Sequence, residues 1–249
     1  MTDLGLPIER IRAVFITHMH EDHAGTLSAI AKRFCNYHKD ADPVTIFLPE
    51  EKGMLCRQAL PKIMELLPKM DAVLIGCGFG QSQGTLEVLS AVLENGNCPV
   101  VVDADGINLL AKHKDLLRGR TAATVLTPHD GEFARLMGYK PLPERTRTAM
   151  DTAAQLGCIL VLKGHETRIS DGTVCYKNPT GNPGMAVGGC GDLLAGMIVS
   201  LLGQGMEPIT AASVAAWLHG AAGDSCAASL GQYGMLPSDM LDVLPRLMK

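Results

Sequence analysis

Short apolar runs alternate with amphipathic segments over most of the chain. The apolar runs have the length of strands and lie at 72–75, 99–102, 124–126 and 158–162. The segments that follow them have helical spacing and lie at about 85–94, 107–117, 133–137 and 149–156. Because parallel strands that are buried on both faces read as continuous apolar runs, this order predicts an α/β domain with a largely parallel sheet flanked by helices.

The C-terminal part of the chain has a different pattern. Strand-like segments at 167–170 and 173–176 flank Asp171-Gly172, which predicts a hairpin with a tight turn. Helical patterns then occupy 193–202, 211–230 and 238–247. The sequence contains no evident internal repeat or low-complexity linker.

Each of the four apolar runs ends in a cluster of residues that suit ligand binding. The clusters are Gly76-Cys77-Gly78-Phe79-Gly80, Asp103-Ala104-Asp105, Thr127-Pro128-His129-Asp130-Gly131-Glu132 and Lys163-Gly164. In open α/β sheets, ligands bind beyond the carboxyl ends of the strands. We therefore expect the four clusters to face one crevice.

A glycine-rich run stands immediately before an apolar helical segment. It reads NPGMAVGGCGD and covers residues 182–192. Glycines let the backbone approach a ligand closely, and the start of a helix attracts anions, so a phosphate is the expected ligand. Asp192 beside a phosphate suits the removal of a proton from a hydroxyl that attacks phosphorus. The run has no P-loop lysine, and its alternative interpretation is a loop that only caps a core helix.

Composition narrows the class of protein. The 249 residues are 47% hydrophobic and 19% charged, as in a globular enzyme, and the net charge of −4 disfavours nucleic acid or membrane partners. The eight cysteines are spread without any Cys-x-x-Cys pair, which is typical of buried thiols in a reducing cytosol. No leader or membrane-spanning run is recognisable, so we expect a cytoplasmic protein.

Six motifs in order closely resemble the ADP/ATP-dependent NAD(P)H-hydrate dehydratases. They are the four clusters, Gly181-Asn182-Pro183-Gly184-Met185-Ala186 and Gly188-Gly189-Cys190-Gly191-Asp192, and the resemblance covers about residues 70–247. It implies a ribokinase-like fold and the repair of hydrated NADH or NADPH. In this family ADP or ATP phosphorylates the hydroxyl of the ring, which then leaves as phosphate. The resemblance also implies Mg²⁺ on the phosphates and a homo-oligomer.

The resemblance assigns a role to each motif. Asp192 is implied as the base that faces the substrate hydroxyl, and Gly78, Gly80 and His129 as contacts to the hydrated dinucleotide. The residues implied in nucleotide binding are Lys163, Gly164, His165, Glu166, Thr167, Gly188, Gly189 and Gly191.

Several of these residues also have a simpler interpretation. His129 could be a polar turn residue, although its place at a strand end beside an acid favours ligand contact. Asp103 and Asp105 could cap the following helix, and Glu132 could support the dipole of its own helix. Lys163 could be a solvated charge at the end of a strand, although its position at the crevice favours nucleotide contact.

Two positions depart from the family pattern. Family members commonly carry hydroxyl residues where this chain has Val187 and Cys190, so two hydrogen-bond donors to phosphate are missing or weakened. A thiol beside a helix N-terminus is expected to be unusually acidic, and we hypothesise that alkylation of Cys190 blocks nucleotide binding. His219, in an alanine-rich helical run, is predicted to be a core or interface residue.

The N-terminal region carries a different motif. His18, His20, Asp22 and His23 have the His-x-His-x-Asp-His spacing of the metallo-β-lactamase superfamily, which suits a dinuclear zinc site. A complete hydrolase of that superfamily does not fit, because only seventeen residues precede His18. The motif therefore belongs either to a grafted hydrolase fragment, which we favour, or to a diverged start of the chain, and its histidines could bind zinc adventitiously or be vestigial.

The same region has the order of a βαβ unit. Predicted strands at 13–17 and 44–48 enclose a predicted helix at 26–34. We interpret residues 1–69 as an atypical segment that resembles a metallo-β-lactamase fragment and fills the first βαβ place of the fold. Residues 70–249 are the dehydratase-like domain, and the two parts are expected to form one unit.

Four functions stay open at this point. The leading interpretation is dehydration of hydrated NADH or NADPH, a small-molecule reaction. The alternatives are a ribokinase-like kinase of a small alcohol, a zinc-dependent hydrolase centred on the N-terminal histidines, and an inactive protein that only binds nucleotide.

Overall fold

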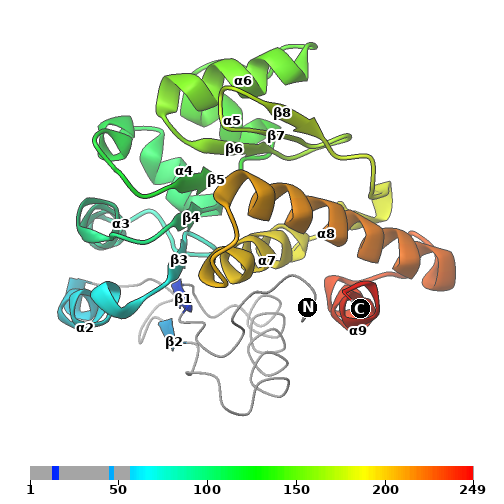
Figure 1. Ribbon diagram of the computed structural model, residues 1–249, viewed down its shortest axis with the longest axis horizontal. Coiled ribbons are helices and arrows are strands. Elements are labelled where there is room, and N and C mark those ends of the chain that lie inside the picture. Colours follow the sequence, from blue (N-terminus) through cyan, green and yellow to red (C-terminus); the bar gives the residue numbers. More distant parts are fainter. Residues whose placement is uncertain (1–12, 17–44, 48–56, 249) are drawn as a thin grey trace.

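One sheet joins all eight strands that the structure describes, in the order β2-β1-β3-β4-β5-β6-β7-β8 (Figure 1). The computed structural model describes residues 13–16, 45–47 and 57–248. The strands are β1 (Ala13–Ile16), β2 (Thr45–Phe47), β3 (Ala72–Ile75), β4 (Val100–Val102), β5 (Thr124–Leu126), β6 (Ile159–Leu162), β7 (Arg168–Ser170) and β8 (Cys175–Lys177). Neighbouring strands from β2 to β6 are parallel, whereas β7 and β8 are antiparallel.

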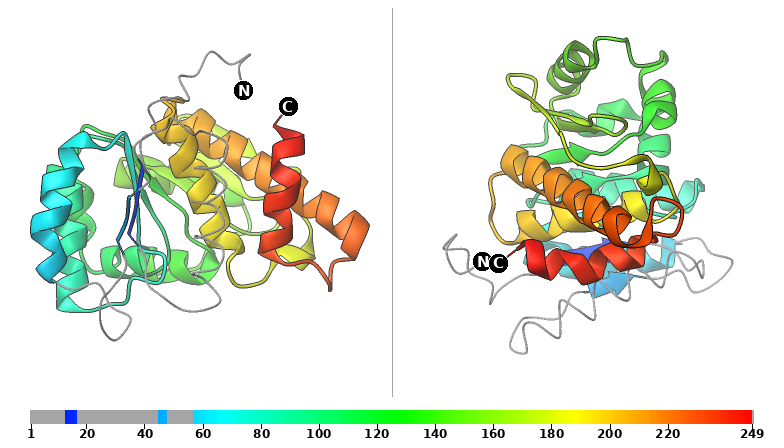
Figure 2. Two further views of the ribbon diagram at one scale, coloured as in Figure 1. Left: turned by 90° about the horizontal axis from the view of Figure 1, so that it is seen from below. Right: turned by 90° about the vertical axis from the view of Figure 1, so that its right-hand side faces the viewer.

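Helices cover both faces of this sheet (Figure 2). The described α-helices are α2 (Leu60–Leu66), α3 (Gln83–Asn95), α4 (Ala104–Leu110), α5 (Asp130–Met137), α6 (Arg145–Leu156), α7 (Cys190–Gly203), α8 (Pro208–Leu230) and α9 (Pro237–Leu247). Short 3₁₀ turns occupy Arg57–Ala59, Leu67–Lys69, Lys114–Leu117 and Pro183–Met185. None of the helices within the described ranges is long and apolar enough to cross a membrane.

Alternation along the strands creates two separate apolar cores. In β3, Val73 and Ile75 belong to the core that packs under α2 to α6, whereas Ala72 and Leu74 belong to the core under α7 and α8. A strand whose side chains are buried on both faces has no polar face, which explains the continuous apolar runs of the sequence. A third apolar cluster joins α9 to α7 and α8.

The predicted α/β order is confirmed, and the helix ends differ from the prediction for local reasons. The predicted helix 107–117 ends at Leu110, because the N–H groups of Lys112 and His113 bond to carbonyls three residues back and tighten the last turn. Helix α5 begins at Asp130 because His129 and Glu132 form a capping box there. The predicted hairpin is present, with Gly172 at φ +93° in its turn.

A half-buried arginine, Arg120, holds the end of α3. The start of α3 is capped by Ser82 and Thr85, because the side-chain oxygen of each residue accepts a hydrogen bond from the backbone N–H of the other. At its other end, the Arg120 guanidinium donates to the carbonyls of Leu93 and Gly96 and, at 3.1 Å, to that of Cys98. A cation at a helix C-terminus satisfies carbonyls that have no partner within the helix.

Two strands of the N-terminal region belong to the same sheet. The predicted strands 13–17 and 44–48 appear as β1 and β2, and β1 pairs with β3 in parallel register. The predicted helix 26–34 and the motif of His18, His20, Asp22 and His23 lie outside the described residues. The division of the chain at residue 69 therefore stays a prediction.

Candidate functional site

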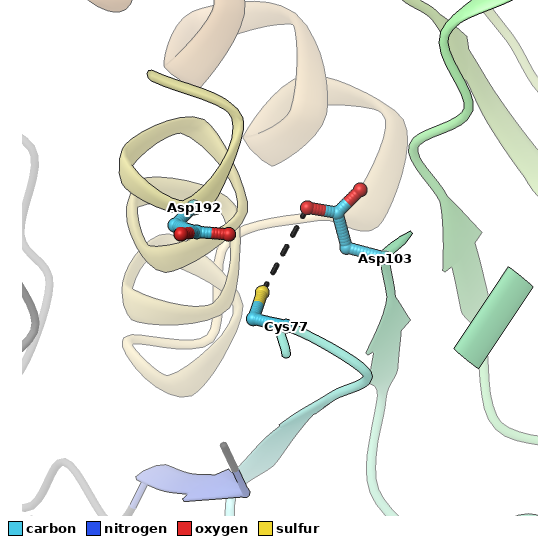
Figure 3. A group of neighbouring side chains, drawn as sticks. All are labelled: Cys77, Asp103 and Asp192. Atoms are coloured by element: carbon cyan, nitrogen blue, oxygen red, sulfur yellow. Dashed lines mark hydrogen bonds between the residues drawn. The ribbon is translucent and has the colours of Figure 1, made fainter. Parts of the chain in front are cut away.

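Three buried side chains from three different elements meet at the carboxyl edge of the sheet (Figure 3). Cys77 follows β3, Asp103 follows β4, and Asp192 lies in the first turn of α7. One ligand atom of each lies within 4.8 Å of the others. The Cys77 Sγ donates to Asp103 Oδ2 at 3.7 Å. The residues after β3 and β4 thus meet the start of α7 at one edge of the sheet, whereas a crevice around them stays a prediction.

The glycine run leads into α7 and thereby places Asp192 beside Cys77 and Asp103. Gly189 has a φ of +91° and is the residue from which α7 starts, and the following residues Cys190 to Asp192 form its first turn. N–H groups in the first turn of a helix have no partner within it. Val187 and Gly188, on the way into the turn, are exposed. The loop is thus accessible to a ligand, while the Asp192 side chain is almost entirely covered.

Asp103 and Lys163 form an ion pair beside Asp192. Lys163 Nζ donates to Asp103 Oδ1 at 2.8 Å, and the Thr127 hydroxyl donates to the same oxygen at 2.7 Å. The two charged side chains are only 2% and 17% exposed, so water screens the pair little. Residues from the ends of three neighbouring strands, β4, β5 and β6, thus meet in one contact.

The pair shifts both pKa values away from neutrality. Burial acts to raise the pKa of Asp103, but the Lys163 charge and the hydrogen bonds from Lys163 and Thr127 outweigh it, so the pKa lies below its ordinary value. Burial acts to lower the pKa of Lys163, but the charges of Asp103 and Glu132 outweigh it and raise the pKa. Both groups are therefore charged at neutral pH.

Lys163 also lies against the start of α7. A Cβ placed on Gly191 would be 3.3 Å from Lys163 Nζ, so a glycine there lets the ammonium approach the backbone of the first turn. The Lys163 Nζ also lies 3.7 Å from Glu132 Oε2. The ammonium thus adds a full positive charge beside a helix terminus that already attracts anions.

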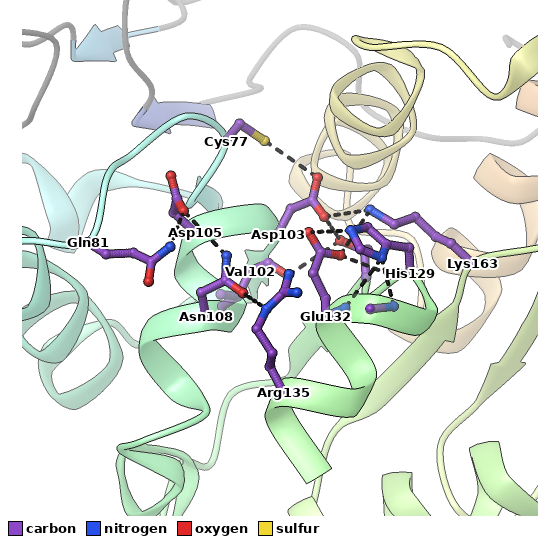
Figure 4. Close-up of polar contacts among 12 residues, drawn as sticks. Cys77, Gln81, Val102, Asp103, Asp105, Asn108, His129, Glu132, Arg135 and Lys163 are labelled. Atoms are coloured by element: carbon purple, nitrogen blue, oxygen red, sulfur yellow. Dashed lines mark hydrogen bonds and ion pairs between the residues drawn. The ribbon is translucent and has the colours of Figure 1, made fainter. Parts of the chain in front are cut away.

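His129 and Glu132 are linked at the start of α5 (Figure 4). Glu132 Oε2 accepts from the His129 backbone N–H at 2.9 Å, and His129 Nδ1 accepts from the Gly131 N–H at 2.9 Å. The His129 side chain is 55% exposed, and its Nε2 lies 3.4 Å from Glu132 Oε1. His129 is therefore a capping residue, and its contact with a ligand stays a prediction.

The loop after β3 is tied to the loop after β4 (Figure 4). Asp105 accepts from the Gly80 N–H at 2.9 Å and from the Gln81 amide at 2.8 Å. Gly78 and Gly80 both have positive φ values, of 58° and 74°. The predicted dinucleotide contacts Gly78 and Gly80 thus lie in a loop that Asp105 orients.

The predicted nucleotide segment 163–167 connects β6 to β7. Gly164 and His165 are exposed, and Thr167 donates to the carbonyl of Gly164 at 3.1 Å. Glu166 pairs with Lys177 and Arg168. Arg145 also stabilises the segment, because its guanidinium donates to the Lys163 carbonyl at 2.9 Å.

One expectation from the sequence, for Cys190, and two of the simpler interpretations, for Asp103 and Lys163, are wrong. Cys190 is buried, and burial raises the pKa of its thiol to about 11, so it is not an acidic, reactive thiol. Asp103 makes no capping hydrogen bond, because its carboxylate is engaged by Lys163 and Thr127 instead. Lys163 is not a solvated strand-end charge. His219, as predicted, is a core residue, and burial lowers its pKa to about 4.

Some supporting residues were not predicted. The motif that contains Thr127 predicts no role for it, although a hydroxyl directly after a buried strand is a signal for such a contact. Asp224 accepts from the Gly181 N–H at 2.9 Å and from the Asn182 amide at 3.0 Å, and so anchors the glycine run on α8. Nothing local in the sequence around Asp224 indicates this role.

Family comparisons agree with the motif order. A family model described as NAD(P)H-hydrate dehydratase matches residues 30–246, and one described as metallo-β-lactamase superfamily matches residues 1–44. The chain is 43% identical over 217 residues to the bifunctional NAD(P)H-hydrate repair enzyme Nnr of Moorella thermoacetica, covering 85% of this chain and 41% of that protein. It is 41% identical over 170 residues to the ADP-dependent (S)-NAD(P)H-hydrate dehydratase of Neisseria meningitidis, covering 65% and 57%. The chain thus spans about two fifths of the length of the bifunctional relative.

Solved structures show the same fold. The ADP/ATP-dependent NAD(P)H-hydrate dehydratase of Bacillus subtilis, co-crystallized with ATP/Mg²⁺ and soaked with CoA, aligns with a TM-score of 0.73 and 27% identity. The alignment covers 95% of this chain and 90% of that one. A ribokinase-like superfamily protein from Enterococcus faecalis aligns with a TM-score of 0.74 and 25% identity, covering 96% and 86%. The ribokinase-like fold predicted from the sequence is therefore confirmed.

Proposed function

The chain belongs to the NAD(P)H-hydrate dehydratase family, and we propose that it dehydrates hydrated NADH or NADPH with ADP or ATP as phosphoryl donor. One observation carries the proposal. The Asp192 carboxylate lies in the first turn of α7, and the Lys163 ammonium lies beside Gly191 in the same turn. A base for a hydroxyl and a positive environment for a phosphoryl group are thus adjacent.

The reaction uses these two groups in sequence. Asp192 accepts the proton of the ring hydroxyl as its oxygen attacks the terminal phosphorus of the nucleotide, and the nucleotide leaves one phosphoryl group shorter. Lys163 and the first-turn N–H groups stabilise the charge on the transferred group. The phosphorylated ring then loses phosphate as the ring nitrogen donates its electrons, and the ring carbon next to the vacated one releases a proton to the departing phosphate or to water, which restores the double bond of NADH or NADPH.

The remaining predicted contacts fit around this centre. Gly78, Gly80 and His129 stand at the ends of β3 and β5 and are proposed to contact the dinucleotide. The segment Lys163 to Thr167 and the glycines of 188–191 are proposed to contact the nucleotide. The exposure of Gly164, His165 and Gly188 supports this, because a ligand can reach their backbone.

Mg²⁺ is the metal ion that this chemistry requires. It prefers oxygen ligands, and the site offers carboxylate oxygens from Glu132 next to a proposed phosphate position. The donor set therefore fits a cation held mainly by phosphate oxygens. When bound, such an ion neutralises phosphate charge, while proton removal stays with Asp192.

The decisive experiment compares the intact protein with Asp192→Asn on hydrated NADH, with ADP and ATP in parallel. Return of the absorbance of reduced nicotinamide reports dehydration, and calorimetry reports nucleotide affinity. We expect kcat to fall by about 10²–10⁴-fold, the typical contribution of a general base, with nucleotide affinity changed by less than about threefold. The matched control is Asp151→Asn, because Asp151 is an exposed acid in α6.

Two results would contradict the proposal. Unaltered turnover by Asp192→Asn removes this residue from the mechanism. Phosphate transfer to a small alcohol, without conversion of hydrated NADH, assigns the chain to the small-alcohol kinases instead. Light scattering on the same preparation tests the proposed homo-oligomer, and fractionation of cells tests the proposed cytoplasmic location.

A further inference from the structure

A thiol takes part in the buried cluster at the centre of the site. Cys77, Asp103 and Asp192 are each less than 10% exposed, and they converge from β3, β4 and α7 (Figure 3). Proton transfer and phosphate binding make no use of the Cys77 thiol. Sulfur beside two carboxylates is, however, a ligand set that favours thiophilic divalent cations.

The separation of the atoms suits such an ion. With Zn–S of about 2.3 Å and Zn–O of about 2.0–2.2 Å, a tetrahedral zinc centre holds sulfur and oxygen ligands about 3.5 Å apart. Cys77 Sγ and Asp103 Oδ2 are 3.7 Å apart. A carboxylate oxygen of Asp192 lies within 4.8 Å of both atoms, so all three ligand atoms can face one ion. Three protein ligands leave a fourth position open.

We propose that Cys77, Asp103 and Asp192 bind a thiophilic divalent cation, such as Zn²⁺ or Cd²⁺, and that this ion inhibits the enzyme. Mg²⁺ does not compete for the thiolate, because it is a hard cation that prefers oxygen ligands. The site is thus distinct in chemistry from the magnesium that accompanies a nucleotide.

The charges of the surroundings favour the ion. Asp103, Asp192 and Glu132 carry three negative charges, against one positive charge on Lys163. Lys163 bonds to Oδ1 of Asp103, whereas the thiol faces Oδ2, so the carboxylate can keep the ammonium on one oxygen and bind the ion with the other. The ion therefore does not have to break the buried ion pair.

Binding displaces one proton. The Cys77 thiol loses its proton to the solvent, its sulfur lone pair forms the bond to the cation, and no electrons are transferred. Burial, reinforced by Asp103 and Asp192, raises the pKa of this thiol well above its ordinary value, so the thiol is protonated in the ion-free protein. Affinity for the cation should consequently increase with pH.

Inhibition follows from the ligand role of Asp192. A carboxylate that donates its electrons to a cation is no longer available to take the proton of the substrate hydroxyl. This step rests on the proposed function, whereas cation binding does not. Because the ion occupies the place of the hydroxyl, inhibition should be competitive with hydrated NADH and not with the nucleotide.

Cadmium titration tests the binding directly, since a thiolate bound to Cd²⁺ gives a charge-transfer absorption in the ultraviolet. The intact chain is compared with Cys77→Ser and with Cys158→Ala, a buried thiol on the opposite side of the sheet from α7. We expect about one proton released and one thiolate band per site, lost in Cys77→Ser and kept in Cys158→Ala. Cys77→Ala, checked by circular dichroism, replaces the serine variant if that variant does not fold.

The activity assay completes the test. The Cd²⁺ concentration for half-inhibition, measured in the presence of Mg²⁺ and reversed by chelator, should rise at least tenfold in Cys77→Ser. A band that persists in both Cys77 variants overturns the proposal, because another cysteine then binds the ion. A band that is absent from the intact chain overturns it as well, because the ion then binds without a thiolate, for example at His18, His20 and His23. A preparation without dehydratase activity contradicts the proposed function alone, since the spectroscopic result still decides whether the site exists.

Discussion

Replacement of Lys163 by methionine should strongly destabilise the fold, because it leaves the Asp103 carboxylate buried without its cation. Lys163 Nζ is 2.8 Å from Asp103 Oδ1, and Asp103 is 2% exposed. Removal of one partner of a buried ion pair typically costs about 3–5 kcal/mol. Thr127 still donates to the carboxylate, so we expect a loss near the lower end of this range.

The double variant Lys163→Met with Asp103→Asn should recover part of this loss. It removes both buried charges and keeps an acceptor for the Thr127 hydroxyl. We expect it to be more stable than Lys163→Met alone by about 2 kcal/mol or more, since the uncompensated charge is the main cost. Lys62→Met is the matched control, because its ion pair with Glu65 is more than half exposed and should contribute less than about 1 kcal/mol.

The pH dependence of the pair has a definite sign. The pKa of Asp103 is lowered from 3.8, so its stabilisation is complete above that value and is lost as the pH falls through the lowered pKa. The pKa of Lys163 is raised from 10.5, so its stabilisation is complete below that value and is lost as the pH rises through the raised pKa. Between these limits, the difference between the intact chain and Lys163→Met should be nearly constant.

Urea unfolding followed by far-ultraviolet circular dichroism measures these effects, with the slope m checked for each variant. The reasoning fails if Lys163→Met stays within about 1 kcal/mol of the intact chain while Lys62→Met behaves the same way, because a buried pair cannot then be present. It also fails if the loss of stability in the double variant equals the sum of the losses in Lys163→Met and Asp103→Asn, because the two side chains are then not coupled.

Two further predictions concern stability outside the proposed chemistry. Arg120→Ala should lower the free energy of unfolding by about 2–4 kcal/mol, since hydrogen bonds from a charged group to carbonyls in and just after the last turn of α3 are lost; an unchanged melting temperature would contradict this. Burial lowers the pKa of His219 to about 4, so stability should be complete above pH 6.5 and fall by up to about 3 kcal/mol as the pH decreases to about 4. His219→Leu should flatten that dependence in urea unfolding at pH 7 and 4.5, and an equal slope in both proteins would refute the assignment.

The location of the site could be predicted from the sequence, because topology fixes it. Parallel strands end at one edge of a sheet, so the clusters after β3, β4, β5 and β6 had to come together once the alternation of strands and helices was recognised. The glycine run before α7 predicts an anion site by the same kind of local reasoning, and that role stays a prediction.

The partners within the site could not be predicted in this way. Asp103 directly before a helix has the sequence pattern of a cap, and only the order β4-β5-β6 shows that Thr127 and Lys163 lie next to it. Sixty residues separate Asp103 from Lys163 along the chain. The local sequence pattern thus places these residues at one edge of the sheet, but it does not show which of them contact one another.

Burial explains the wrong prediction for Cys190. A helix N-terminus favours the thiolate by about 0.3–1 kcal/mol at exposed positions, which is less than one pKa unit. Burial acts in the opposite direction and raises the pKa of Cys190 to about 11. The sequence shows that the thiol is near a helix start, but the extent of its burial depends on packing between distant elements.

Backbone geometry, rather than side-chain packing alone, holds the cluster of Cys77 and Asp103 in place. Gly76 has a φ of +118°, and a Cβ there would lie 2.0 Å from the Asp103 carbonyl oxygen, so the loops after β3 and β4 cross at a distance that only glycine allows. Ala104, at φ +48°, has a conformation that non-glycine residues rarely adopt, and this suggests that surrounding contacts fix it. Because the backbone sets the position of Cys77, exchange of its sulfur for oxygen should leave the site in shape, and any change in cadmium binding by Cys77→Ser can be assigned to the ligand atom itself.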